Sequence, residues 1–144
     1  MRKRIFGRRL QRDTNERKAL FRSLMRELVL HGKIKTTEAK AKSIRGEMEK
    51  MVTKAKLQGE NAAVHLQKKF TGDVVEKLIK EIAPLFKDRP GGYTRIIKMG
   101  RRVKDNAPMV LLEWVETVAD TTIVETKKRV KKTVAEKKEK GVKK

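Results

Sequence analysis

Positive charge dominates this sequence. Its 144 residues include 39 Lys and Arg against 18 Asp and Glu, which gives a formal net charge of +21. Charge at that density repels itself in a compact isolated domain, so the chain is expected to meet a polyanion. Nucleic acid is the first candidate for that polyanion, and an anionic membrane surface is the second. Apolar residues make up 38% of the chain, a lean core that suits one small domain with tails rather than two domains.

The charge is distributed unevenly along the chain. Residues 1–12 hold six basic side chains and no acidic one, whereas residues 120–144 hold ten basic and four acidic ones. The segment between them, 13–119, holds 23 basic and 14 acidic side chains. The sequence therefore predicts a basic N-terminal arm over 1–12, a globular α/β domain over 13–119 and a Lys-rich C-terminal tail over 120–144.

Several classes of protein are excluded by what the sequence lacks. There is no cysteine, which excludes a disulfide framework, a Cys-ligated zinc site and a thiol nucleophile. His31 and His65 do not have the spacing of metal ligands, and no Gly-rich phosphate loop or nucleophile elbow is present. No apolar run reaches the roughly 18 residues that span a bilayer, and residues 1–12 lack the apolar stretch of a secretory signal. We expect a cytoplasmic protein that is not an enzyme and takes no cofactor, metal, membrane or small-molecule substrate.

Hydrophobic periodicity predicts helices in the first two thirds of the chain. Leucines recur every four residues after Asp13, which opens a capping-box pattern, and Gly32 stands in a C-cap position. Asp73 opens a second capping-box pattern, and Pro84 marks the end or the last irregular turn of the helix that follows. The expected helices cover residues 13–31, about 36–59, about 61–70 (a weak one) and about 73–84.

Two β-rich runs follow the helices. The runs 93–99 and 109–115 surround a polar loop of about nine residues and predict a hairpin, and the short segment 33–36 is a candidate strand. Apolar residues occupy odd and even positions alike in both runs, whereas a sheet covered on one face only should alternate more cleanly. Part of the second face is therefore expected to be covered by a partner.

Five motifs in register carry a resemblance to a known family. They are Gly7-Arg8-Arg9-Leu10, the run from Arg17 to Arg22, Lys35-Thr36-Thr37 with Lys40-Ala41-Lys42, the run from Arg89 to Ile96, and the run from Asp105 to Met109. Over about residues 1–118 the chain resembles the bacterial ribosomal protein family numbered seventeen in the large subunit. Lys3 and Glu16 stand where members usually carry histidine, and the tail after Thr117 falls outside the family pattern.

The resemblance implies both a fold and a function. The implied fold is α+β: a two-layer α/β domain in which three to four helices pack on a small sheet that contains the C-terminal β-hairpin. The implied function is direct binding to the large-subunit ribosomal RNA near the outer end of the nascent-chain tunnel. Neighbouring large-subunit ribosomal proteins are the further partners, and the cytoplasmic ribosome is the location.

The two ends of the chain differ in the chemistry of their charge. The arm holds five Arg and one Lys, and the planar guanidinium pairs with phosphate through two donors at once and stacks on bases. We therefore expect the arm to contact RNA, the alternative being a solvated charge run. The tail holds nine Lys and one Arg, for which weak phosphate attraction and plain solvation both remain open.

Two further segments supply candidate RNA contacts. Basic residues between Arg17 and Arg26 share the side of the first helix away from its leucines, which fits either phosphate contact or a solvated face. The glycines before Tyr93 predict a turn with positive φ, and Tyr93 is a candidate for stacking on RNA; Trp114 is expected in the core or at a protein interface. The predicted RNA-binding residues are Arg2, Lys3, Arg4, Arg8, Arg9, Arg12, Arg17, Lys18, Arg22, Lys33, Lys35, Lys40, Tyr93, Arg95, Lys98, Arg101 and Arg102.

Two other functions compete with RNA binding. A DNA-compacting, histone-like protein would share the charge and the basic arms, but it usually needs a dimer interface and apolar wedges, for which Phe6 is the one candidate. A membrane-surface protein would need a basic helix with an aromatic-rich apolar face, which this sequence lacks.

Overall fold

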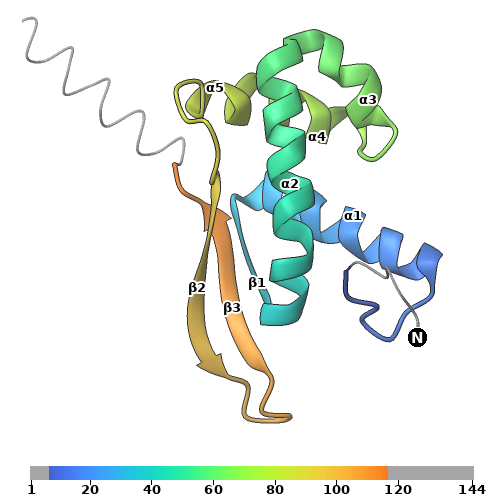
Figure 1. Ribbon diagram of the computed structural model, residues 1–144, viewed down its shortest axis with the longest axis vertical. Helices are drawn as coiled ribbons and strands as arrows, with labels where there is room; N and C mark the ends of the chain where they lie inside the picture. Colours follow the sequence, from blue (N-terminus) through green and yellow to red (C-terminus); the bar gives the residue numbers. More distant parts are fainter. Residues whose placement is uncertain (1–6, 117–144) are drawn as a thin grey trace, which may run out of the picture.

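Two long helices and a three-stranded sheet form the frame of the protein, shown in Figure 1 as a computed structural model that describes residues 7–116. Short helical turns connect the second long helix to the C-terminal hairpin. In chain order the elements are α1 (Thr14–His31), β1 (Lys33–Thr37), α2 (Glu38–Gln58), the 3-10 turn η1 (Gly59–Ala62), α3 (Ala63–Gln67), α4 (Gly72–Lys77), the π-helical turn η2 (Leu78–Ile82), α5 (Ala83–Leu85), β2 (Thr94–Arg101) and β3 (Pro108–Trp114).

The sheet is antiparallel, with the strand order β1-β3-β2. Leu111 at its centre pairs with Lys35 of β1 and with Ile97 of β2. The register of β2 on β3 shifts between Lys98 and Gly100, which is a bulge that leaves one extra residue on β2. The hairpin and the brief strand over 33–36 that the sequence predicts are therefore both present.

Helices cover one face of the sheet, so the fold is the expected α+β domain in two layers (Figure 1). Along β3 the side chains alternate: Val110, Leu112 and Trp114 are buried, whereas their neighbours Met109 and Leu111 are only half-buried. The buried set points toward α2, and the half-buried set lies on the uncovered face. The core between the layers comprises Met25, Leu28, Val29, Ala41, Ile44, Met48, Val52, Leu78, Phe86, Tyr93, Val110, Leu112 and Trp114, among others.

Trp114 joins the end of the sheet to the first helix. Its indole Nε1 donates a hydrogen bond to the carbonyl oxygen of Leu28 at 3.2 Å, and its backbone N–H donates to Gly32 at 3.3 Å. Gly32 has a φ of 75°, the left-handed conformation of a C-cap, and its N–H donates to the Leu28 carbonyl. The prediction that Trp114 lies in the core or at a protein interface is confirmed for the core, because the residue is 4% exposed.

The helix starts differ in detail from the sequence prediction. Asp13 occupies the N-cap position of α1 with an extended backbone, but its side chain makes no capping hydrogen bond. The N-cap of α4 is Thr71, so the capping box predicted at Asp73 is wrong. Asp73 instead lies in the first turn of α4, where its negative charge interacts favourably with the positive end of the helix dipole. The helix predicted over 73–84 is divided by the π-helical turn η2.

Candidate nucleic-acid interface

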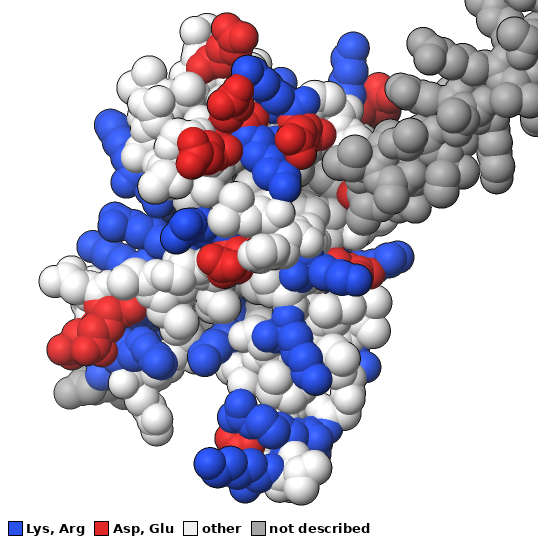
Figure 2. All heavy atoms as spheres, turned by 180° about the vertical axis from the view of Figure 1, so that it is seen from behind, with Lys and Arg blue, Asp and Glu red and all other residues white. Residues whose placement is uncertain are grey.

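Basic residues concentrate on one part of the described chain. Residues 7–58 hold 15 basic and 6 acidic side chains, and residues 89–116 hold 6 and 3. Residues 59–88, which form the helical end with α3, α4 and α5, hold five of each. Figure 2 shows this contrast from behind, with acidic atoms gathered at the upper end and basic atoms around the hairpin tip below. The arm, the long helices and the hairpin are therefore the candidate polyanion surface.

An open hollow of about 820 Å³ lies between the arm, the start of α1 and the first half of α2. Phe21 contributes the apolar part of its wall. The charged groups that line it are five cations and two carboxylates: Arg8, Arg9, Arg12, Arg17 and Lys42 against Asp13 and Glu47. Arginines from two elements, the arm and α1, line this one concave site, and guanidinium groups are suited to an oxyanion such as a phosphate.

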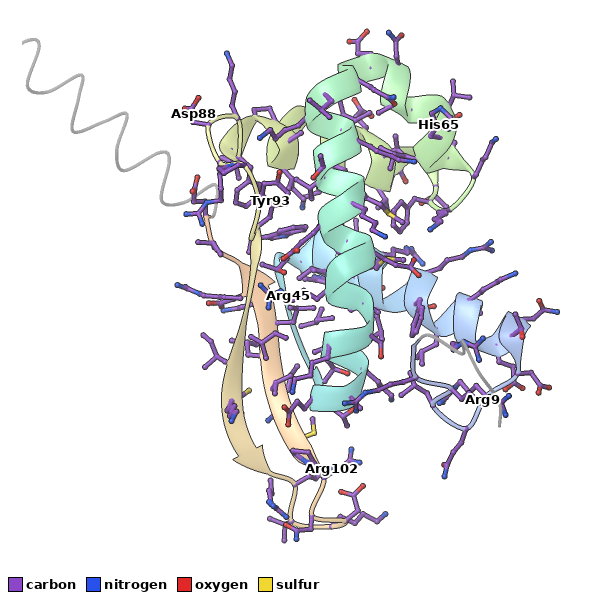
Figure 3. The ribbon with its side chains drawn as sticks, viewed as in Figure 1. Arg9, Arg45, His65, Asp88, Tyr93 and Arg102 are labelled. Atoms are coloured by element: carbon purple, nitrogen blue, oxygen red, sulfur yellow. The ribbon has the colours of Figure 1, made fainter. Side chains whose placement is uncertain are left out.

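A tight turn folds residues 7–12, the described part of the arm, against the helices. Leu10 and Gln11 have φ values of 56° and 52°, and the N–H of Arg12 donates to the carbonyl of Arg9 at 3.2 Å. The Arg12 guanidinium donates to the Leu10 carbonyl at 3.1 Å, and that of Arg17 donates to the Arg12 carbonyl at 3.4 Å. Two adjacent non-glycine residues in the left-handed region store strain, which is typical of functional sites. Figure 3 shows Arg9 on this turn, away from the sheet.

The start of α2 lies in a positive field from three elements. Lys42 pairs with Glu38 at 2.6 Å and lowers the pKa of that carboxyl, and more distant Lys98 and Arg8 lower it further. Lys42 belongs to α2, Lys98 to the hairpin and Arg8 to the arm. The hollow and the helix-facing side of the hairpin therefore contribute to one positive region around Glu38.

The hairpin tip carries its own basic cluster. Lys98 and Arg101 are exposed, and Lys104, which the sequence prediction omitted, is exposed beside them. Arg102 is held by Asp105 through two hydrogen bonds of 2.8 and 2.5 Å, which lower the pKa of Asp105 to about 2. Arg102, labelled in Figure 3, therefore braces the tip turn with its guanidinium.

The burial of Tyr93 corrects one prediction made from the sequence. Its side chain is only 1% exposed and lies between β2 and α2 (Figure 3), so its ring cannot stack on RNA in this fold. The hydroxyl lies 3.3 Å from that of Thr53, and the Lys56 ammonium lies 5.7 Å from the ring centroid. The expectation of a stacking residue is wrong because Tyr93, directly before β2, packs against Phe86 in the core.

The rest of the glycine turn is also held within the protein. Gly92 has the predicted positive φ, at 65°. The Arg89 guanidinium pairs with Glu116 at 3.1 Å, and the Arg89 carbonyl accepts a hydrogen bond from Lys56 at 2.6 Å. Arg95 reaches across to Glu113 on β3 at 2.5 Å. This segment is thus tied to α2 and to the end of the sheet by hydrogen bonds and ion pairs. Among its side chains, the exposed Arg95 remains a candidate RNA contact.

The remaining predicted residues lie on three surfaces. Lys18 and Arg22 are exposed on α1, whereas Arg17 is half-buried and faces the hollow, so the basic residues of α1 do not share one side as expected. Lys33 and Lys35 are exposed on β1, and Lys40 is half-buried in the first turn of α2. The predicted contacts Arg2, Lys3 and Arg4 lie outside the described residues.

Lys42 is the hollow residue that sequence reasoning missed. It follows Glu38 by one helical turn, a spacing that signals an ion pair within the helix rather than a ligand site. The hollow forms only when the arm folds back beside α2, and helical periodicity carries no information about that contact.

The described range, residues 7–116, holds neither a metal-binding cluster nor a membrane-spanning helix. No group of three or more His, Asp or Glu side chains in this range could hold a metal ion. None of the helices in the same range is both long and apolar enough to cross a membrane.

Fold and surface together define a small basic α+β protein with a concave, arginine-lined hollow. A family model with the description "Ribosomal protein L17" matches residues 20–115, so the chain belongs to this family. It is 49% identical over 112 residues to a protein of Pelobacter propionicus, covering 76% of this chain and 87% of the relative. It is 48% identical over 118 residues to one of Trichlorobacter lovleyi (78% and 92%) and 44% identical over 129 residues to one of Oenococcus oeni (76% and 98%). All three relatives are called "Large ribosomal subunit protein bL17".

Proposed function

We propose that this protein is a structural constituent of the large ribosomal subunit that binds ribosomal RNA and supports subunit assembly and translation. It acts without catalysis, in the cytoplasmic ribosome, beside other large-subunit proteins. The names of its relatives support the location. The observation that carries the RNA contact is the hollow, in which five cations face two carboxylates.

The hollow suits a phosphate of an RNA backbone for two physical reasons. Arginine forks bind phosphate oxygens through paired, charge-assisted hydrogen bonds, and each contact releases counterions from the RNA. The start of α1 lines the same hollow through Asp13 and Thr14, so the positive end of the helix dipole adds to the field there. Exposed Lys18 and Arg22 extend the positive surface along α1.

The three parts of the chain have separate roles in this proposal. The arm 1–12 supplies arginines to the RNA, the domain 13–119 holds the hollow and the hairpin in place, and the tail 120–144 adds weaker charge. RNA that neutralises the surplus charge binds the folded state and so stabilises it by mass action.

Directed cleavage of the RNA tests the proposal. Because the sequence has no cysteine, Thr14→Cys places a single thiol on the lining of the hollow, where tethered Fe(II)-EDTA generates radicals locally. Val64→Cys, 66% exposed at the charge-balanced helical end, is the matched control. In purified large subunits we expect strong ribosomal RNA cleavage from position 14 and weaker cleavage from position 64. Absence of cleavage from position 14, or purification of the protein with nucleoid DNA instead of large subunits, would overturn the proposal.

A further inference from the structure

The sheet has a face that the helices leave uncovered, called here the outer sheet face. In Figure 1 all the helices lie on the other side of the sheet. Strand alternation and register place eight residues on the outer sheet face: Lys33, Lys35 and Thr37 of β1, Met109, Leu111 and Glu113 of β3, and Arg95 and Ile97 of β2.

The centre of the outer sheet face is apolar. Leu111 and Ile97 pair across β3 and β2, and Met109 follows Leu111 on the same side of its strand. Ile97 is 43% exposed, and Met99 at the adjoining bulge is 49% exposed. A solvated face of an antiparallel sheet is normally polar, so an apolar centre of this kind indicates a surface that is covered in the assembled state.

The edges of the outer sheet face are cationic. Lys33 and Lys35 stand exposed on the β1 edge, and Arg95 stands on the β2 edge. Glu113, the acidic residue of this face, lies between Lys33 and Arg95 in the register and pairs with Arg95. The net positive charge disfavours a basic protein partner and favours a polyanion.

We propose that the outer sheet face is a second RNA-binding surface, separate from the hollow, which takes an unpaired stretch of ribosomal RNA. Lys33 and Lys35 contact phosphates, and the riboses and base faces pack on Ile97, Leu111 and Met109. Unpaired nucleotides expose such apolar faces, whereas a regular RNA duplex hides its bases in the stack. This inference rests on the proposed function and adds the kind of RNA that this face takes.

Affinity for large-subunit ribosomal RNA, measured over a range of salt concentrations, separates apolar from ionic contacts. Ile97→Thr keeps the β-branched shape and removes apolar contact, so affinity should fall about three- to tenfold at an unchanged salt slope. Lys35→Gln should lower the log–log slope by about 0.7 to 0.9. Leu57→Gln, at a position 79% exposed near the end of α2, is the control and should change neither quantity. Unchanged affinity for Ile97→Thr would overturn the proposal.

A photo-reactive residue in intact subunits tests the same face directly. Benzoylphenylalanine in place of Ile97 should form an adduct with ribosomal RNA, and the same residue in place of Thr14, which lines the hollow, reports on the proposed function. A protein adduct or no adduct at position 97, together with an RNA adduct at position 14, would overturn the inference and leave the proposed function standing. Absence of an RNA adduct at position 14 would count against the proposed function itself.

Discussion

The ring of Tyr93 lies 5.1 Å from the ring of Phe86, with the two planes tilted by 54°. Phe86 in turn lies 6.0 Å from Trp114, so three aromatic side chains join the residue after α5 to the residue before β2 and to the end of β3. Tilted aromatic pairs at such distances stabilise a core beyond the area that they bury. The glycine turn before Tyr93 therefore positions a core residue.

Replacing Tyr93 by leucine should destabilise the protein and leave RNA binding intact. Tyr93→Leu removes the contact with Phe86 and leaves a cavity, a change that costs on the order of 2–4 kcal/mol of unfolding free energy. Thermal unfolding and RNA affinity, measured well below the melting temperature, check this prediction. Tyr93→Phe is the control: it keeps the ring and loses only the hydroxyl contacts, so about 1 kcal/mol is expected. Normal melting with lost affinity for Tyr93→Leu would contradict the core assignment.

The two glycines before Tyr93 should respond differently to substitution. Gly92 has a φ of 65°, so Gly92→Val forces a β-branched residue into the left-handed region at a cost of about 1–3 kcal/mol. Gly91 has no such φ, and a Cβ added there would meet nothing within 4 Å, so Gly91→Ala should be nearly neutral. Urea unfolding of both variants measures the difference. An equally small loss of unfolding free energy in both variants would mean that the turn tolerates side chains at either position, which would contradict the prediction.

Local pattern was enough to predict most of the fold. The four-residue leucine period and Gly32 predicted α1 and its end, and the β-rich runs around a polar loop predicted the hairpin. The division of the helix after Thr71 was not predictable, because the choice of a π-helical turn depends on packing against the rest of the domain.

The candidate site was less predictable from sequence. Residue type alone indicated that Arg8, Arg9, Arg12 and Arg17 were candidates, and the structure places all four around one hollow. Residue type could not indicate which cations pair within the protein, as Arg102 does with Asp105, and it could not distinguish an exposed aromatic ring from a buried one, as with Tyr93. Both distinctions depend on contacts between residues that the chain brings together only on folding.

The hairpin tip should keep its ion pair to low pH. Arg102 lowers the pKa of Asp105 from its ordinary value of 3.8 to about 2, so the pair stabilises the folded tip above pH 3.8 and loses that contribution as the pH falls through about 2. Carboxyl titration followed by NMR should show this low pKa, and Arg102→Gln should return it toward 3.8. A titration of Asp105 near 3.8 in the unmodified protein would show that the pair does not persist in solution.

The two ends of the chain should differ in their contribution to RNA binding. Deleting 1–12 and deleting 120–144 each remove a formal side-chain charge of +6. We expect the first deletion to weaken binding to ribosomal RNA far more, because arginine forks fix a geometry on phosphate whereas hydrated lysines do not. Filter binding at one salt concentration compares the two truncated proteins. Equal losses would mean that charge alone determines the affinity.

The salt dependence of RNA binding tests the central claim, that the hollow between the arm, α1 and α2 holds RNA phosphates. The triple variant Arg9→Gln, Arg12→Gln, Arg17→Gln should bind large-subunit ribosomal RNA with a log–log salt slope about 2 to 3 lower than the unmodified protein, since each lost phosphate contact removes about 0.7 to 0.9. The variant Lys68→Gln, Lys80→Gln, Lys87→Gln removes the same charge from the balanced helical end and should keep the slope nearly unchanged. Equal slopes for the two triple variants would contradict the account.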